Sequence, residues 1–287
     1  MSAIVLQRVV VRMMYDPAFR KRVYANPERT LRDVPLTPQE RQWLVTPAPS
    51  AYGTDGYRSS RALTGLLEEF PVAGALAVRL PRGIQRLQQF FATPSFHQCV
   101  QERGSMAAAF GAYLGSEAFR SRKTPLESAH IARVETGIAQ VRRSSPPLSF
   151  STESVTAETR FGLAPWVALL TVHPDTLDRY SALLASLRQY DGSLIEAVLD
   201  TQHHLPTGPA FRGKATAYVL VSHIPGSDGP SLESMSDDLG NLLAAVRTPR
   251  LLGEVWALVE EMGCEPQEAR DVIAGLVEDR ILRRMSN

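Results

Sequence analysis

The stretch that decides the fold runs from 216 to 285 and opens with Thr216-Ala-Tyr-Val-Leu-Val-Ser222. Apolar residues alternate along this opening, and the pattern predicts a strand that is covered on one face and half covered on the other. A turn-rich segment, Pro225-Gly-Ser-Asp-Gly229, comes next, followed by a short second strand near 231–234. The sequence therefore predicts a hairpin in a small antiparallel sheet.

Three helical segments follow the hairpin. Leucines from Leu239 to Leu243 mark the first, Thr248-Pro249 carries the start signal of the second, and Pro266 begins the third. Apolar stripes at helical spacing are usually core, so they establish helices and little else. The order of strand, hairpin, strand and three helices is that of a small winged-helix domain.

Apart from a stretch rich in Pro, Ser and Gly at 47–56, the residues before 145 are typical of helices, and none of them alternates with period two for long. Asp16-Pro17 is a helix start, and Thr37-Pro-Gln-Glu40 has the sequence of a capping box. A run rich in Ser, Thr and Pro then breaks the pattern. An apolar run at 165–172 suits a buried strand, although its periodicity alone does not exclude a helix. We therefore expect an α+β protein with an all-α domain at 1–145, a linker at 146–160 and a winged-helix-like domain at 161–287.

Composition restricts the function classes. The 287 residues carry a formal net charge of +1, so a general attraction to nucleic acid or to acidic membranes is missing. Cys99 and Cys264 have no metal-ligand or disulfide spacing. The sequence has neither a signal-peptide pattern nor an apolar stretch as long as a membrane span, so we expect a cytoplasmic protein without membrane contact.

The sequence contains no phosphate-binding loop, dinucleotide fingerprint, nucleophile elbow or zinc-protease motif. We read His203-His204 as loop residues, because a third metal ligand is missing nearby. His130 and Glu135 lie five positions apart on one helix, which is not a metal-pair spacing. His97, among three phenylalanines, is read as a hydrogen-bonded structural imidazole. We expect no catalytic residues, no metal, no cofactor and no independent enzyme activity.

Two binding functions remain open for the winged-helix stretch. As a DNA-binding regulator, it would use the third helix to present arginines, namely Arg270, Arg280, Arg283 and Arg284, although acidic residues on the same helix cancel their field. As a peptide-binding module, it would add an extended peptide to the edge of the second strand. The residues predicted to line that groove are Ser231, Leu232, Glu233, Ser234, Val272, Leu276 and Arg280. Core packing alone is the competing explanation for each of them.

Two family resemblances cover most of the chain. The first half resembles the HvfC-type helical domain, which has been described as DNA-binding. The segments that carry this resemblance are Tyr57-Arg-Ser-Ser-Arg-Ala-Leu, Glu69-Phe-Pro-Val72, Phe90-Phe91, Ala109-Phe-Gly-Ala-Tyr-Leu114 and Pro125-Leu-Glu-Ser-Ala-His-Ile-Ala-Arg-Val-Glu135. Residues 218–282 are similar to the PqqD-like element that binds leader peptides of ribosomally made, modified peptides.

Chains that join these two parts resemble the partner proteins of multinuclear non-heme iron oxidases. The resemblance implies a non-catalytic subunit that forms a heterodimer with the oxidase, binds the precursor peptide's leader and presents the peptide for modification. The iron ligands would then belong to the oxidase. We take this as the leading hypothesis and a DNA-binding regulator as its alternative, with nucleic acid disfavoured by the near-neutral charge.

Overall fold

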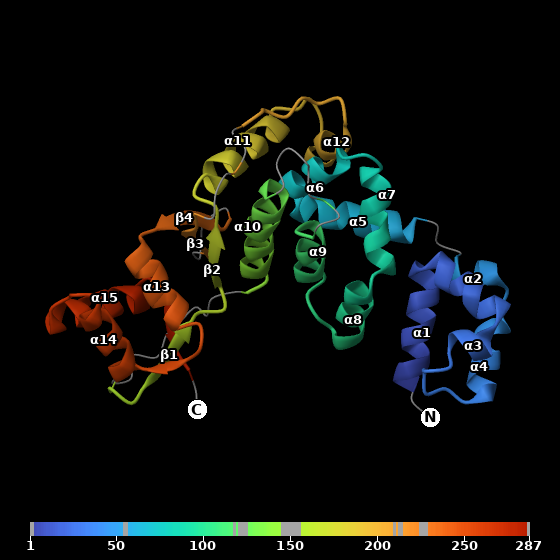
Figure 1. The fold of residues 1–287 in the computed structure, drawn as a ribbon, viewed down its shortest axis with the longest axis horizontal. Helices are drawn as coiled ribbons and strands as arrows, with labels where there is room; N and C mark the ends of the chain where they lie inside the picture. The colour runs from blue at the N-terminus through green and yellow to red at the C-terminus, as the bar shows by residue number, and fades with distance from the viewer. Residues whose placement is uncertain are drawn as a thin grey trace. The chain divides into compact units, whose positions relative to one another are not determined.

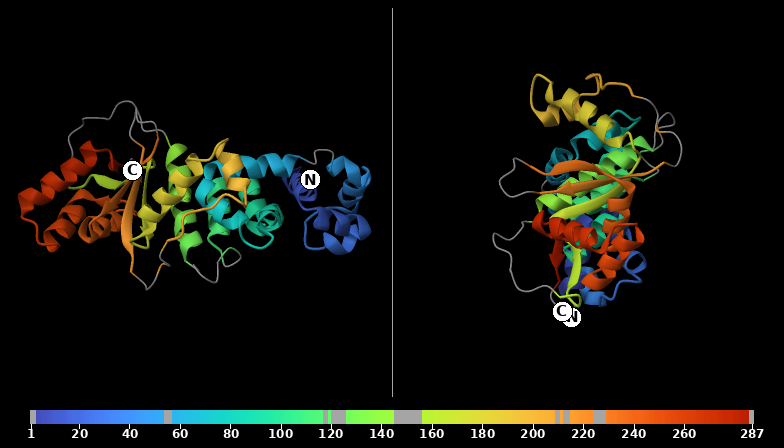
Figure 2. Two further views of the ribbon diagram at one scale, coloured as in Figure 1. Left: turned by 90° about the horizontal axis from the view of Figure 1, so that it is seen from above. Right: turned by 90° about the vertical axis from the view of Figure 1, so that its left-hand side faces the viewer.

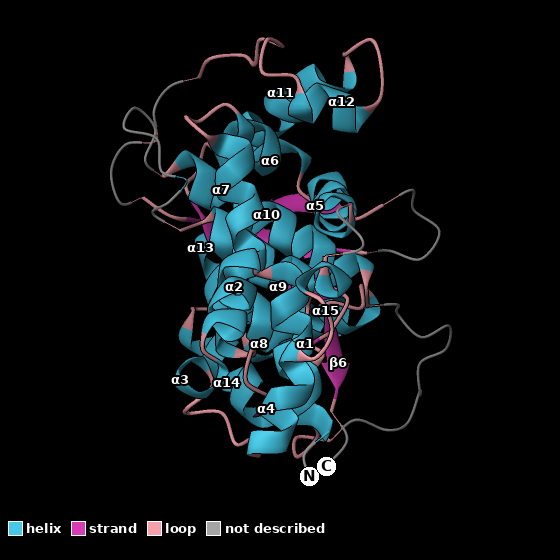
Figure 3. Cartoon of the chain, turned by 90° about the vertical axis from the view of Figure 1, so that its right-hand side faces the viewer, coloured by secondary structure: helices cyan, strands magenta, loops and turns pink. Residues whose placement is uncertain are grey.

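The computed structural model describes residues 3–53, 57–116, 119, 126–144, 156–208, 211, 215–223 and 229–285 (Figure 1). The chain divides into two compact units. Unit 1 comprises Met1–Ser121 with Leu184–Leu205, and unit 2 comprises Arg122–Leu183 with Pro206–Asn287. The expected coarse class, helices with small antiparallel sheets, is confirmed (Figure 3). Residues 146–155 of the expected linker lie outside the described residues.

Unit 1 consists of helices. Proline or a capping residue begins most of them, because proline fixes φ near the helical value and needs no amide partner in the first turn. Their bounds are α1 Ala3–Tyr15, α2 Pro17–Ala25, α3 Pro27–Thr30, α4 Pro38–Val45, α5 Arg58–Glu69, α6 Pro71–Val78, α7 Gly83–Gln89, α8 Pro94–Glu102, α9 Met106–Leu114 and α12 Leu194–Leu199, with short 3₁₀ turns at Pro49–Tyr52 and Phe90–Ala92.

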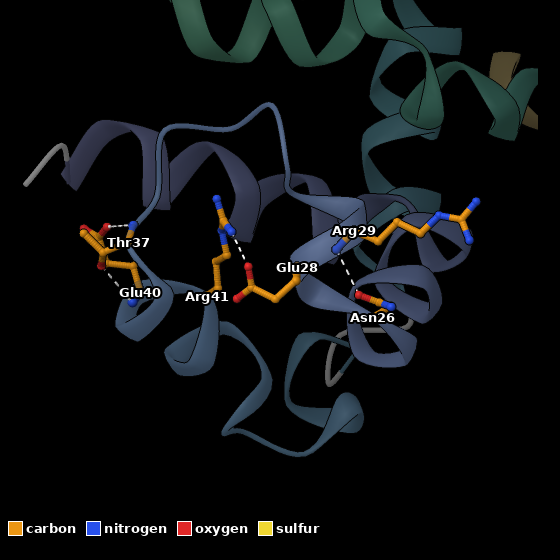
Figure 4. Close-up of polar contacts among 6 residues, drawn as sticks. All are labelled: Asn26, Glu28, Arg29, Thr37, Glu40 and Arg41. Atoms are coloured by element: carbon orange, nitrogen blue, oxygen red, sulfur yellow. Dashed lines mark hydrogen bonds and ion pairs between the residues drawn. The ribbon is translucent and has the colours of Figure 1, made fainter.

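Side-chain N-caps begin the helices α3 and α4 (Figure 4). Glu40 N donates to Thr37 Oγ1 at 3.2 Å and Thr37 N donates to Glu40 Oε2 at 2.7 Å, which confirms the predicted capping box. Asn26 accepts the Arg29 amide in the same way at 2.9 Å. The N-terminal helices also have a small core of their own, formed by Val9, Met13, Phe19, Val23, Leu31, Leu36 and Leu44.

Arg79 fixes the late segment of unit 1 to α6. Its guanidinium donates to the carbonyl oxygens of Ala75 at 2.8 Å, Asp200 at 2.7 Å and His203 at 3.0 Å. The acceptors after α12 are orphan carbonyls near a helix C-terminus, which a cation stabilises. Residues from 184 to 205 therefore pack in unit 1, although they follow strands of unit 2 in the sequence.

Unit 2 is built on the antiparallel sheet β2-β3-β4, formed by Val167–Val172, Ala217–Ser222 and Ser231–Met235. The register pairs Leu169 with Leu220 and Leu220 with Glu233. Because side chains alternate, the face that carries Leu220 is opposite the face that carries Val219 and Val221. The two-faced strand predicted for 216–222 is thus confirmed, while the hairpin turn at 225–228 lies outside the described residues.

Helices cover both faces of this sheet (Figure 2, left). α10, Glu127–Arg142, lies on the Val221 face, where a Cβ on Gly137 would be 3.2 Å from Val221 Cγ2. The C-terminal helices lie on the Leu220 face, and Gly240 is so close to Tyr218 that a Cβ would be 2.0 Å from its ring. The remaining helices of unit 2 are α13 Asp237–Ala245, α14 Leu252–Glu261, α15 Pro266–Glu278 and the start of α11, Thr176–Arg188.

A second sheet was not expected. Its order is β5-β1-β6, with strands at Arg250–Leu251, Arg160–Leu163 and Leu282–Arg284. β1 begins at Arg160, the last residue of the stretch expected to be linker. β5 occupies the predicted start of the second C-terminal helix, so that helix begins at Leu252. Among the described residues, no helix is long and apolar enough to cross a membrane.

Candidate peptide-binding site

The candidate site begins with the backbone of β4, which is the last strand in its sheet. His223 donates its N–H at 3.2 Å to the carbonyl of Trp166, the residue before β2, so the backbone of the preceding Ser222 turns the other way, toward its β4 partner Ser231. By the same alternation, Leu232 and Ser234 turn their N–H and C=O groups outward. An outward row of this kind is a template for an added strand.

A hollow of about 500 Å³ lies beside this edge on the Leu220 face. Leu220 is 2% exposed and forms part of its apolar floor, and Glu233 is an exposed residue on its wall. The other lining residues are Ser222, Glu278, Asp279, Arg280 and Ile281. An apolar floor with a polar rim next to a strand edge is the environment in which an extended peptide can bury alternate side chains.

The far wall is shaped by the turn that ends α15. Ile281 N donates to Leu276 O at 2.8 Å and Arg280 N donates to Val277 O at 3.0 Å, which is the hydrogen-bond pattern of a Schellman motif. Arg280 has the left-handed φ of 62°, a position that normally favours glycine. Its carbonyl accepts the Trp166 indole N–H at 2.9 Å, so the turn is fixed to the core of unit 2.

The predicted site residues are only partly brought together. Glu233 and Arg280 line the same hollow, and Ser231 supports it through a 2.8 Å hydroxyl contact with Ser222. Leu232 pairs with Val221, so its side chain lies on the α10 face and not toward the helix that was expected to share a groove with it. Ser234 points the same way as Leu232.

The two helical residues predicted for the groove differ in burial. Leu276 is 6% exposed and belongs to the core of unit 2, so packing explains it. Val272 is 38% exposed and does not line the hollow. Most of the wall was therefore not predicted, because the apolar stripe of α15 does not continue into the residues that line the hollow. A signal was present in Glu278-Asp-Arg-Ile281, where charged residues interrupt the apolar repeat.

The arginines predicted to lie on the third helix are the clearest correction. α15 ends at Glu278, and only Arg270 of the four lies on it, with its guanidinium 5.6 Å from the Trp256 ring centroid. Arg283 and Arg284 belong to β6, which pairs with β1. The Schellman turn ends the helix before these residues, so the expected arginine-bearing recognition helix is wrong.

No protein-family model matches this chain, and neither a curated protein nor a solved structure is significantly similar to it. The site must therefore be judged on its own chemistry. Within the described ranges, no three His, Cys, Asp or Glu side chains are grouped to hold a metal ion. His203 contacts Ser186 Oγ through Nε2 at 3.3 Å and packs edge-on against Tyr190.

The charge of the hollow is mainly acidic. Glu233, Glu278 and Asp279 contribute three carboxylates to its lining, and Arg280 contributes one guanidinium. Carboxylates attract a positively charged ligand and repel a negatively charged one. The hollow therefore suits an extended peptide that carries a basic side chain at the position next to Glu233.

Proposed function

We propose that this chain binds an extended peptide by strand addition to β4 and presents it to a multinuclear non-heme iron oxidase. The outward backbone groups of Leu232 and Ser234 carry the proposal, because they offer hydrogen bonds to any sequence that adopts a strand. The adjoining hollow supplies selectivity through its apolar floor and acidic rim. In this function the chain is a binding subunit, and the oxidase provides the metal chemistry.

The connection to an oxidase rests on the family resemblance. The order of three antiparallel strands followed by α13, α14 and α15 is the observation that supports a PqqD-like element, and the sequence of the first half resembles the HvfC type. Arginine positions give the DNA-binding alternative no comparable support, since three of the four lie outside α15.

The decisive variant is Ser234→Pro, and Ser234→Ala is its matched control. Proline removes an outward N–H without removing a bond to β3, so an edge strand tolerates it. We expect Ser234→Pro to weaken binding of the peptide by about tenfold or more, because one lost hydrogen bond costs roughly 1 kcal/mol and the ring also blocks close approach. Ser234→Ala retains the amide and should bind like the unmodified chain.

Fluorescence polarization with short peptides encoded beside this chain's gene measures the effect, with circular dichroism to verify that Ser234→Pro is folded. Equal affinity of the proline and alanine variants would exclude strand addition at β4. Co-expression with neighbouring oxidase genes tests the second part. Failure to co-purify with any iron-containing oxidase, while peptide binding persists, would remove the oxidase from the proposal and leave the peptide site.

A further inference from the structure

A second hollow lies in unit 1, between α1 and α8, and has no part in the peptide site. Its volume is about 200 Å³, which is small-molecule size. Polar side chains from α1, from α8 and from the residue that follows α8 line it, namely Gln7, Arg8, Gln101 and Arg103, together with His97. The first four of these residues are exposed, whereas His97 is only 6% exposed.

His97 lines this hollow and has a buried hydrogen-bonding atom without a partner among the described residues. Its imidazole bonds to the backbone of Phe91, while Nε2 is buried without a hydrogen-bond partner among the described residues. The Phe91 bond therefore uses Nδ1, which leaves the lone pair on Nε2. Burial lowers the pKa of His97, and the neighbouring Arg12 lowers it further, against the opposite effects of Asp16 and the Phe91 bond. A buried acceptor without a partner is costly, so a ligand that donates to it gains that energy.

The lining of the hollow carries two positive charges. The guanidinium groups of Arg8 and Arg103 have no ion-pair partner within the described ranges of the chain. Arg103 follows α8 with a left-handed φ of 53°, and the turn is closed by the Gly104 amide, which donates to Cys99 O at 2.8 Å. An arginine at this position is strained relative to glycine, and such strain is often found at binding sites.

We propose that this hollow binds a small oxyanion, with a phosphate or carboxylate group held between Arg8, Arg103 and Nε2 of His97. Arginine matches the oxygens of both groups with paired N–H donors. The hydrogen bond between the ligand and Nε2 of His97 requires a proton on one of the two atoms. Either a protonated oxygen of the ligand donates to Nε2, or His97 takes up one proton from solvent and donates Nε2–H to the anion. The apolar side chain of Val11 adjoins the polar groups and accommodates a short hydrocarbon part.

Titration of the full chain with inorganic phosphate and, separately, with propionate tests the site and distinguishes the two ligand chemistries. Nitrogen-detected NMR of the histidine side chains follows His97 directly. We expect one of the anions to shift the Nε2 resonance of His97 in a saturable manner. Arg8→Gln and Arg103→Asn should each weaken that binding by roughly tenfold, since a charge-assisted bond is lost. Asparagine tolerates the left-handed conformation, so Arg103→Asn keeps the turn.

Arg32→Gln is the matched control, because Arg32 is an exposed arginine of the same unit that lies outside the hollow. It should leave the affinity unchanged. The proposal is overturned if neither anion shifts the His97 resonance, which would mean that no anion reaches Nε2. It is equally overturned if Arg32→Gln weakens binding as much as Arg8→Gln does, which would indicate general charge screening.

Discussion

His97 in unit 1 is buried and His130 in unit 2 is partly buried, and burial is the main cause that lowers the pKa of each imidazole. They differ in what meets their lone pair. Nδ1 of His130 accepts the backbone N–H of His173 at 3.3 Å, and Phe211 stacks on the His173 ring at 4.6 Å. Nε2 of His97 meets no partner in the described part of the chain.

This difference separates a structural histidine from a candidate binding group. A satisfied acceptor ties α10 to the end of β2, so its neutral form is part of the fold of unit 2. An unsatisfied acceptor at a polar hollow contributes nothing to unit 1 until a donor arrives. The two histidines should therefore respond differently to pH and to added anions, and each response can be measured.

The largest effect is expected at His130. The pKa of His130 is about 4 in the folded chain and 6.5 in the unfolded chain. The contribution of the neutral imidazole to the free energy of unfolding is therefore fully present above pH 6.5 and is lost as the pH falls toward 4. Because solvent screens a partly exposed imidazole, the stability effect is smaller than the roughly 3 kcal/mol that a fully buried group with this shift would give. We expect His130→Asn, whose amide oxygen can still accept from His173, to lose less stability over this range. Urea unfolding at several pH values, followed by circular dichroism, measures the difference.

His204→Asn is the control for this experiment, because His204 is exposed in a loop of the other unit. Its pH profile should match that of the unmodified chain. Arg133 and the His173 ring also act on His130 and lower its pKa, and Asp175 lies 3.6 Å from His173 Nδ1. If His130→Asn shows the same acid loss as the unmodified chain, one of these other groups causes it.

A smaller effect is expected at His97, and it should depend on the anion. In buffer without oxyanions, stability should decline as the pH falls below 6.5, because the folded pKa is lowered and the unfolded chain binds the proton first. A bound phosphate or carboxylate favours the charged imidazole and should cancel this decline. Paired urea titrations at pH 5 to 7, with and without the anion that binds, measure it. A decline that the anion leaves unchanged would remove His97 from the anion site.

Features that depend on residues close together in the chain could be predicted from the sequence. The capping box at Thr37 and the alternation of 216–222 depend on neighbouring residues, and both are confirmed. Strands of two to four residues carry no usable period, so β1, β5 and β6 were missed. The His130 partner could not be predicted either, because the His173 amide comes from a residue 43 positions away. The face of Leu232 required the register of β4, which the hairpin sequence alone does not fix.

The smallest expected effect concerns the arginines beside the two hollows, Arg103 and Arg280. Both have left-handed backbones, with φ values of 53° and 62°. Glycine removes a strain of about 1–2 kcal/mol but increases the freedom of the unfolded chain by roughly 0.5–1 kcal/mol. Arg103→Gly and Arg280→Gly should therefore each raise the free energy of unfolding by about 0.5–1 kcal/mol, and the corresponding alanine variants should not.

The anion separates these two otherwise equivalent changes. Arg103→Gly removes a group that the proposed oxyanion contacts, so it should reduce the stabilisation that the anion gives to unit 1. Arg280→Gly lies in unit 2 and should leave that stabilisation intact, so the two variants control for one another. Equal loss of the anion effect in both would assign the anion to a general charge response. Loss in Arg103→Gly alone would place the binding group next to His97, where the unpartnered Nε2 requires a donor.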